Sequence, residues 1–325
     1  MSDRIRWGIL STGNIAAAFA EDLRLLPDAE LAAVGSRSTE AAETFAAKHG
    51  AARAHGSWRA LVEDPDVDAI YVATPHTAHY EAAMLALRAG KATLCEKPFT
   101  LAVGEAEELV ETARSGGVFL MEAMWMRCIP AVRRMIELAG DGAIGEVVSV
   151  HADFGMQGPF PETSRLRDRR LGGGALYDVG IYPVTFADLF LGRPSSVQAW
   201  ARMSAGGVDE NTGMLFGYDS GAVAALTCSL LGDSARRATV TGTLGRMEVA
   251  RDFFHPAGFT LWRGESAEHI DLPFEGRGYQ FEAAEVHRCL REGLPESPLV
   301  PLSDTLAILR ILHEISGKIG LDYSS

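Results

Sequence analysis

Strands and helices alternate along the first 123 residues, and this alternation constrains the fold more than any other feature of the sequence. Short apolar stretches are each followed by a stretch whose apolar residues recur every three or four positions. Strands that are apolar on both faces belong in a parallel sheet with helices on both sides. We therefore expect a doubly wound α/β domain over residues 1–123, with strands at 4–10, 29–36, 68–75, 91–98 and 118–123.

The turn after the first strand reads STGNIA, Ser11–Ala16. Compared with the dinucleotide pattern G-x-G-x-x-G/A, Ser11 replaces the first glycine, while Gly13 and Ala16 fit the second and third positions. The second glycine lets a pyrophosphate approach the backbone, and the amides at the start of the next helix hold its charge. An ordinary tight turn is the alternative, but the position at the start of a βαβ unit favours a nucleotide site. The expected cofactor contacts here are Ser11, Thr12, Gly13, Asn14 and Ile15.

The end of the second strand bears on the choice between NAD and NADP. An NAD site has an acidic residue about 20 residues after the glycines, where it binds the ribose hydroxyls. This sequence has VGSRST and no acid at the strand end. The hydroxyl of Ser36 and the paired donors of Arg37 suit a 2′-phosphate, although a solvated arginine is the simpler alternative. We expect NADP(H) to be preferred, with NAD(H) as the alternative.

The segment CEKP, Cys95–Pro98, closes the fifth strand at the same sheet edge as the glycine loop. There the ammonium group of Lys97 would face the nicotinamide end of a dinucleotide and stabilise negative charge that develops on a substrate oxygen. Glu96 is expected against the nicotinamide ribose, and a cis Lys97–Pro98 bond is a reasonable hypothesis. An exposed lysine in a polar loop is the alternative for this motif taken alone.

The fourth strand ends in VATPHTAHY, at the edge where open α/β sheets bind ligands. Thr74, Pro75 and His79 are therefore candidates for the cofactor site, with a helix first-turn role as the alternative for His79. We interpret His76 as a surface loop residue. No carboxylate or cysteine cluster accompanies these histidines, and no metal site is expected.

The second half of the chain, residues 124–325, contains several strand candidates without intervening helices. This pattern predicts an α+β domain with a large open, mostly antiparallel sheet, followed by C-terminal helices that can pack back on the first domain. In GEVVSVHADFG, residues 145–155, Val148, Val150, Ala152 and Phe154 alternate and share one face. Phe154 is a candidate for the substrate pocket, with a place in the core as the alternative.

Three glycines, 172–174, precede ALYDVGIYPVTFADLF, which we expect to form one helix interrupted at Gly180 and Pro183. Asp178 and Tyr182 are four positions apart, so they would project from one face of that helix.

The composition excludes several classes of protein. The net charge of −13, without a Lys/Arg block, would repel nucleic acid. No apolar run approaches the ~20 residues of a membrane span, and the N-terminus has no signal-peptide pattern. The four cysteines are not in CxxC spacing and are interpreted as buried free thiols. These features indicate a cytoplasmic protein.

Taken together, the motifs resemble the Gfo/Idh/MocA oxidoreductase family. The resemblance rests on GILSTGNIA, VATPHTAHYEAAMLALRAGK, CEKP, MEAMWMRCIPA and GGGALYDVGIYPV, and it follows the family order over essentially the full length. It is closest to the branch that holds dimeric trans-dihydrodiol dehydrogenases and NADP-dependent D-xylose 1-dehydrogenases. By that analogy, we expect a homodimer or higher oligomer that forms through the open sheet.

The resemblance implies roles for further residues. In most of the family, the last position of the D-x-G-x-H motif is a histidine that acts as the acid/base. This chain has Tyr182 at that position, as in the dihydrodiol dehydrogenase branch. A phenol has a reference pKa of about 10, and a nearby ammonium such as that of Lys97 would favour phenolate. Asp178 would orient either group. By similarity, Trp125 and Arg127 border the nicotinamide and the substrate, with interdomain packing as the alternative for Trp125.

The sequence therefore predicts an NADP-dependent oxidoreductase that moves a hydride between the nicotinamide and a hydroxyl of a sugar, polyol or cyclic diol. A keto-sugar reductase of a deoxysugar pathway is a second hypothesis. A non-catalytic regulator that senses NADP(H) is a third, against which the retention of both Lys97 and Tyr182 argues.

Overall fold

The computed structural model describes residues 4–161 and 163–323, which divide into two compact units. Unit 1 contains the chain through Cys128 and also the segment Glu275–Leu306. Unit 2 contains Ile129–Phe274 and the chain from Ala307 onward. The chain thus returns to unit 1 after the second sheet. The division into functional domains at residue 123 stays a prediction.

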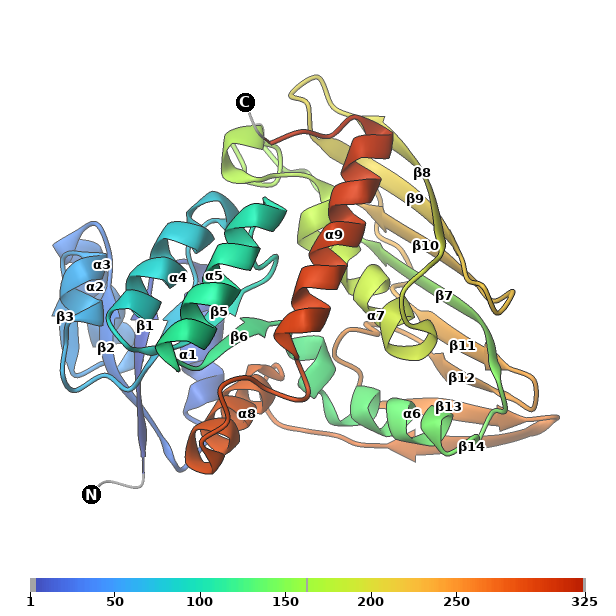
Figure 1. Cartoon of the computed structure of the whole chain (residues 1–325), viewed down its shortest axis with the longest axis horizontal. Helices are drawn as coiled ribbons and strands as arrows, with labels where there is room; N and C mark the ends of the chain where they lie inside the picture. Colours follow the sequence, from blue (N-terminus) through green and yellow to red (C-terminus); the bar gives the residue numbers. More distant parts are fainter. Residues whose placement is uncertain (1–3, 162, 324–325) are drawn as a thin grey trace. The chain divides into compact units, whose positions relative to one another are not determined.

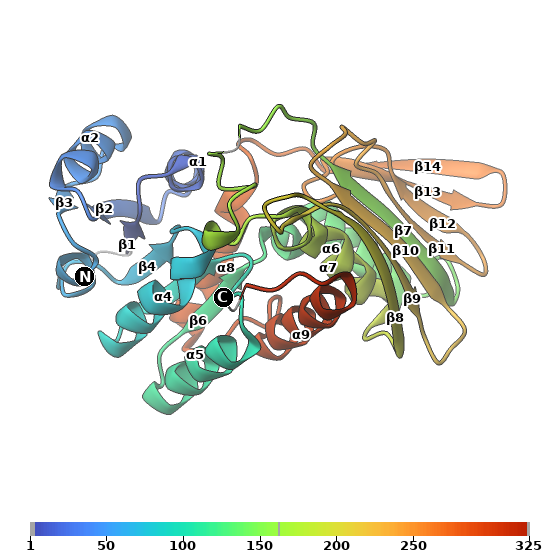
Figure 2. The ribbon, with the colours of Figure 1, turned by 90° about the horizontal axis from the view of Figure 1, so that it is seen from above.

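Unit 1 is built on a parallel sheet in the order β3-β2-β1-β4-β5-β6, which confirms the doubly wound fold. Helices α1 and α2 lie on one face, and α3, α4 and α5 lie on the other (Figures 1 and 2). The order reverses between β1 and β4, so the ligand-binding crevice of such a sheet is at the carboxyl ends of these two strands. The strands are β1 (Ile5–Leu10), β2 (Ala29–Gly35), β3 (Arg53–His55), β4 (Ala69–Val72), β5 (Ala92–Glu96) and β6 (Leu120–Ala123). The helices are α1 (Asn14–Leu23), α2 (Thr39–His49), α3 (Trp58–Val62), α4 (His79–Arg88) and α5 (Val103–Gly116).

Helix α8 (Tyr279–Glu292) belongs to unit 1 because its first turn is bound to α1. The carboxylate of Asp22 accepts hydrogen bonds from the backbone N–H groups of Arg277, Gly278 and Tyr279, at 2.8, 2.9 and 3.0 Å. A negative charge at a helix N-terminus is stabilised both by these donors and by the helix dipole. Further along α8, the indole N–H of Trp7 in β1 donates to His287 at 2.9 Å.

Unit 2 is built on an eight-stranded sheet in the order β14-β13-β12-β11-β7-β10-β9-β8. All neighbours pair antiparallel except β7 and β10, which confirms the mostly antiparallel sheet. Helices α6, α7 and α9 cover one face of this sheet (Figures 1 and 2). The strands are β7 (Val147–Gly155), β8 (Ser196–Met203), β9 (Asp209–Gly217), β10 (Val223–Ser229), β11 (Ala238–Gly242), β12 (Arg246–Val249), β13 (Gly258–Arg263) and β14 (Ser266–Asp271). The helices are α6 (Pro130–Gly140), α7 (Ile181–Leu191) and α9 (Leu302–Ile319), of which α9 begins in unit 1.

Alternation along the strands decides which side chains form the core of unit 2. Val150, Ala152 and Phe154 of β7 are buried against the helices, as their spacing predicts. Val148 has the same parity but is 39% exposed. Strand β14 carries mostly exposed polar residues, and the apolar pattern gave no sign of it.

The helix expected from Ala175 to Phe190 starts differently from the prediction. Leu176–Gly180 forms a π-helical turn, and regular α-helix begins at Ile181. Gly180 allows this close packing, since a Cβ there would lie 2.8 Å from the Cys228 sulfur of β10.

All four cysteines are free and buried, as predicted. Within the described ranges, no helix is long and apolar enough to cross a membrane.

Candidate active site

The glycine loop connects β1 to α1 at the crevice of unit 1. Ser11 has a φ of 117°, a backbone conformation that non-glycine residues rarely adopt. Its N–H donates to the Gly35 carbonyl of β2 at 2.9 Å, which ties the turn to the neighbouring strand. The serine therefore occupies the position of the first motif glycine and retains a glycine-like conformation.

The space around Gly13 fits a bound pyrophosphate. A Cβ on Gly13 would meet only the Ser11 hydroxyl, at 3.8 Å, so packing within the described chain does not require glycine there. Helix α1 has no side-chain cap and no acidic residue in its first turn. Its first N–H groups and the positive end of its dipole are thus available to an anion. We infer that these residues suit the phosphates of a dinucleotide.

The end of β2 presents the two residues expected to select the cofactor. Ser36 is half-buried and its hydroxyl accepts from the Ser38 N–H at 3.3 Å, while Arg37 is exposed. Ser38 in turn caps α2, accepting from the Ala41 N–H at 3.2 Å. The chain after β2 is therefore ordered by local hydrogen bonds.

Three hydrogen bonds from three different elements fix the backbone around Lys97. The Lys97 N–H donates to Glu96 at 3.1 Å, the Pro98 carbonyl lies 2.8 Å from His79 Nδ1, and the Phe99 N–H donates to Glu122 at 3.1 Å. The Lys97–Pro98 bond is cis, as expected, and Lys97 is half-buried at the carboxyl edge of the sheet. The lysine is consequently held on a rigid support, as a group that positions charge must be.

His79 contributes to this support from the first residue of α4. Its Nε2 lies 2.9 Å from the carbonyl oxygen of Thr74, so one buried ring contacts the ends of two strand loops. His76 was wrongly interpreted as a surface residue: it is buried, with its ring 5.6 Å from that of His79. The two histidine rings thus pack together next to the loop that contains Thr74 and Pro75.

Glu96 is buried and accepts a hydrogen bond from the hydroxyl of Tyr71 in β4. The Tyr71 ring stacks on Phe19 of α1, with 3.8 Å between ring centroids. Burial, followed by the charge of Glu96, raises the pKa of Tyr71 well above its usual value, so this tyrosine stays protonated and donates. Tyr71 was not predicted, and its signal in the sequence is a hydroxyl inside an otherwise apolar strand.

Two more buried carboxyl groups near Glu96 were not predicted. Glu122 in β6 binds both the Phe99 N–H and the Thr305 hydroxyl, and burial raises its pKa to about 7. Glu282 of α8 is fully buried, and burial together with the charges of Glu96, Asp22 and Glu122 raises its pKa well above the usual value. In the sequence, these two buried carboxyl groups are indicated only by their position as acidic residues within apolar stretches.

Trp125 and Arg127 follow β6 in a short 3-10 turn, Trp125–Cys128. The Trp125 ring is buried 4.5 Å from that of Tyr279 in α8. Arg127 donates to the Leu299 carbonyl at 2.9 Å and to Asp304 at 2.5 Å. These contacts assign Arg127 a part in holding unit 1 together, and its expected contact with the cofactor stays a prediction.

In unit 2, Tyr182 is buried in an aromatic cluster. Its ring centroid lies 5.4 Å from Phe154 and 5.3 Å from Phe254, and these two phenylalanines stack at 4.3 Å. Phe154 is therefore both a core residue and a neighbour of Tyr182. Phe254, in the segment RDFFHP after β12, was not predicted because it is in no regular element.

Asp178 lies in the π-helical turn and is ion-paired to Arg165. The guanidinium Nη2 donates to Asp178 Oδ1 at 2.8 Å, and the Asp178 side chain is buried. Arg165 is part of a segment that we call the arginine strap, Ser164–Leu171. The arginine was not singled out from the sequence, since its 13-residue separation from Asp178 follows no helical spacing.

The triple glycine lets the arginine strap pack directly on the start of this turn. A Cβ on Gly173 would lie 2.5 Å from the Arg165 carbonyl oxygen, and one on Gly174 would lie 2.5 Å from Asp209 Oδ1. The other oxygen of Asp209 accepts from the Leu176 N–H at 2.9 Å. Close approach to the backbone of the strap accounts for Gly173, and a positive φ of 121° together with the nearby Asp209 side chain accounts for Gly174. Among the described residues, no group of three His, Cys, Asp or Glu side chains is placed to hold a metal ion.

The fold and the glycine loop define a two-domain oxidoreductase of the nucleotide-binding type. Residues 5–124 match the model of the Gfo/Idh/MocA oxidoreductase family, NAD-binding Rossmann fold, and residues 132–248 match the GFO/IDH/MocA C-terminal domain. The chain belongs to this family and is an NAD(P)-dependent oxidoreductase that acts on hydroxyl groups, as the motifs predicted.

Similar proteins cover nearly the whole chain. It is 38% identical to mouse and 35% identical to bovine trans-1,2-dihydrobenzene-1,2-diol dehydrogenase, with 98% of both chains covered in each case. A crystal structure of KijD10, a 3-ketoreductase from Actinomadura kijaniata, in complex with NADP and TDP-benzene superposes with a TM-score of 0.86 at 29% identity, covering 97% of this chain and 98% of that one. An aldose-aldose oxidoreductase from Caulobacter crescentus, complexed with glycerol, superposes with a TM-score of 0.88 at 26% identity, covering 97% of each chain.

Proposed function

We propose that this enzyme prefers NADP(H) and transfers a hydride between it and a hydroxyl-bearing carbon of a sugar, polyol or cyclic diol. The similar proteins support this substrate class, since they are named as a cyclic-diol dehydrogenase, an aldose-aldose oxidoreductase and a 3-ketoreductase. Support for NADP comes from Ser36 and the exposed Arg37 at the end of β2, and from the NADP bound in the KijD10 structure.

Lys97, Tyr182 and Asp178 are the proposed catalytic groups. The bound nicotinamide supplies or accepts the hydride. The Lys97 ammonium donates a hydrogen bond to the reacting oxygen and stabilises its developing negative charge. The Tyr182 phenol takes the hydroxyl proton in oxidation and returns it in reduction, while Asp178, paired with Arg165, orients these groups.

The remaining site residues have supporting roles in this proposal. Glu96 borders the nicotinamide ribose, and His79 acts through the backbone of Thr74 and Pro98, which it contacts. Thr74, Pro75 and Arg127 border the cofactor, and Trp125 and Phe154 line the substrate site. The observation that carries the proposal is the threefold backbone support of Lys97, because a lysine in a simple polar loop would not need it.

The first experiment is a fluorescence titration with NADPH and NADH, followed by turnover of NADP⁺ with a panel of aldoses and cyclic diols. We expect tighter NADPH binding, and we expect Lys97→Ala and Tyr182→Phe each to lower kcat by about 100-fold or more. Tyr177→Phe is the matched control, because this buried tyrosine accepts a hydrogen bond from Ser316 and has no proposed role in the reaction. Full activity in both site variants would show that the assignment is wrong.

A keto-sugar reductase is the second candidate, favoured by the similarity to KijD10 over 97% of the chain. It uses the same residues in the direction of reduction. Oxidation of NADPH by a keto-sugar, without reduction of NADP⁺ by any aldose or diol, would distinguish it.

We also propose a cytoplasmic homodimer. Four buried free thiols suit a reducing compartment. The outer face of the sheet in unit 2 supports the dimer: Trp200 and Leu215 on this face are 83% and 52% exposed, and the alternation of the strands places Val223 on the same face.

A further inference from the structure

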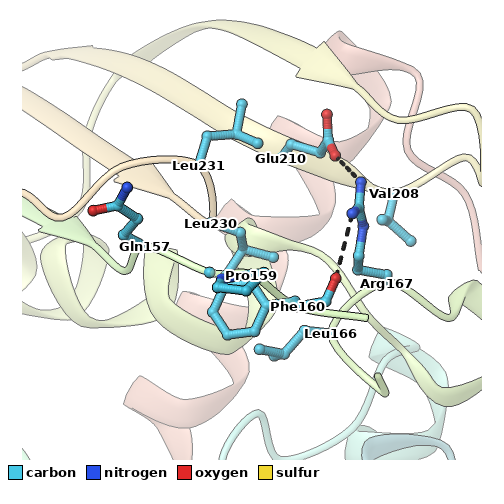
Figure 3. Close-up of a pocket in the computed structure, with 10 residues that line it drawn as sticks. Gln157, Pro159, Phe160, Leu166, Arg167, Val208, Glu210, Leu230 and Leu231 are labelled. Atoms are coloured by element: carbon cyan, nitrogen blue, oxygen red, sulfur yellow. Dashed lines mark hydrogen bonds and ion pairs between the residues drawn. The ribbon is translucent and has the colours of Figure 1, made fainter. Parts of the chain in front are cut away.

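Unit 2 contains a cavity of about 370 Å³ at the carboxyl ends of β7 and β10 (Figure 3). One wall is formed by the loop after β7, residues 157–160, and another by Leu166 and Arg167 of the arginine strap. Val208 and Glu210 at the start of β9, together with Leu230 and Leu231 after β10, complete it. The described walls do not include Tyr182, Asp178 or Phe154, so the cavity is distinct from the aromatic cluster.

The chemistry of the walls favours an uncharged, partly apolar ligand. Pro159, Phe160, Leu166, Leu230 and Leu231 supply an apolar surface on which a ring can pack. The two charged residues, Arg167 and Glu210, pair with each other at 2.6 Å. Glu210 also pairs with Arg202 at 3.4 Å and Arg167 also donates to the Phe160 carbonyl, so groups of the protein balance both charges. A neutral ligand can hydrogen-bond to the outer atoms of these residues and to the Gln157 amide without disrupting the ion pairs.

Three successive residues of the arginine strap connect the cavity to Asp178. Arg165 pairs with Asp178, Leu166 lines the cavity and Arg167 pairs with Glu210. The Leu166 carbonyl also accepts the Gly174 N–H at 2.9 Å, immediately before the π-helical turn. On the other side, Asp209 binds that turn and is followed directly by Glu210. The same short segments thus form the cavity and hold the proposed catalytic aspartate.

We propose that this cavity is a specificity subsite that receives the uncharged ring or apolar group of the substrate that does not react. The inference rests on the proposed function, since the reacting hydroxyl is assigned to Lys97 and Tyr182. The volume of the cavity exceeds that of a few water molecules, at about 30 Å³ each, and is in the range of small-ligand pockets. The subsite sets which diols and sugars bind well, and the hydride transfer itself does not depend on it.

The test uses two diols with the same reacting head, 1-phenyl-1,2-ethanediol and 1,2-propanediol, on the NADP-loaded protein. In Leu231→Trp the larger side chain fills the cavity. Because Leu231 is 41% exposed, this substitution should affect folding little. Leu244→Trp, at a site 69% exposed in the β11–β12 turn, is the matched control. Turnover gives KM and kcat for each diol, and ligand-observed NMR titration measures binding without requiring turnover.

We expect Leu231→Trp to raise KM and Kd for the phenyl diol by about tenfold, while the values for propanediol and all kcat values change less than about twofold. Leu244→Trp should match the unmodified enzyme. Equal effects on both diols, or no effect of filling the cavity on phenyl-diol binding, would overturn the subsite. Ring-dependent binding that is lost in Leu231→Trp, without turnover of any diol or sugar, would support the subsite and refute the proposed function.

Discussion

At the residue scale, buried charges in this protein are held by partners that lie far away in the sequence. Asp178 pairs with Arg165, and Glu96 accepts from Tyr71, 25 positions earlier. A buried carboxylate that loses its partner reorients or becomes protonated, because burial disfavours the charged form. Substitutions of neighbouring residues that never contact the substrate should therefore also change the activity, because these neighbours hold the site carboxylates in place.

Arg165 is expected to be a positioning residue. Arg165→Ala removes the donor to Asp178 Oδ1, and we expect kcat to fall about tenfold, equivalent to about 1.4 kcal/mol of barrier, with NADPH affinity unchanged. Arg170→Ala is the control, because Arg170 pairs with Asp168 on the surface of the same strap. Arg165→Lys should recover part of the activity. Equal kinetics for the alanine variants of Arg165 and Arg170 would argue against the role.

Arg37 is expected to distinguish the two nicotinamide cofactors. Arg37→Ala would remove the proposed charge-assisted hydrogen bond to the 2′-phosphate, so Kd for NADPH should rise about 30-fold, equivalent to about 2 kcal/mol, while Kd for NADH stays the same. Arg59→Ala, an exposed arginine paired with Glu63 in α3, is the control for net charge. A parallel loss of affinity for both cofactors would show that Arg37 does not select between them.

At the scale of elements, the loop after β5 is rigid because β6 and α4 hold its backbone. Glu122 contributes from β6 through the Phe99 N–H and also binds the Thr305 hydroxyl at 2.9 Å. Burial raises its pKa to about 7 in the folded protein, above the value of about 4.3 in an unfolded chain. Its contribution to stability is therefore fully present below pH ~4.3 and is lost as the pH rises to about 7.

Glu122→Gln should remove this pH dependence while keeping an acceptor for the Phe99 N–H. The free energy of unfolding of the variant, relative to the unmodified protein, should increase between pH 5 and pH 8, by up to about 3 kcal/mol. Urea unfolding at the two pH values measures it. If the difference between the two proteins does not change with pH, then Glu122 is not the titrating group.

At the scale of the whole molecule, the outer face of the sheet in unit 2 is the surface that we propose for self-association. Trp200 lies opposite Gly213 of β9, next to Leu215 in the following row of the sheet. Exposed apolar groups of this size are typical of interfaces between proteins.

Trp200→Glu should convert the proposed homodimer to a monomer, which sedimentation analysis at micromolar concentrations would detect. The introduced charge would have to be desolvated in the interface, and this cost weakens association. Leu244→Glu, with the same change of charge in the β11–β12 turn, should leave the dimer intact. A dimer that survives Trp200→Glu would place the interface elsewhere.

Much of the architecture and several site positions follow from local sequence patterns. The strand–helix alternation predicted the parallel sheet, and CEKP was correctly placed at the end of β5. The supporting residues Tyr71, Glu122, Arg165 and Phe254 were not found, since each acts through a residue distant in the chain.

The sequence by itself determined the order and type of most elements, because periodicity and turn residues act over a few neighbouring positions. Only the tertiary structure decided that residues 275–306 return to unit 1, that the helix containing Tyr182 begins with a π-helical turn, and which carboxyl groups are buried. These features depend on packing and on hydrogen bonds between distant segments. The free energy of such contacts is set by burial and geometry, which no short stretch of sequence specifies.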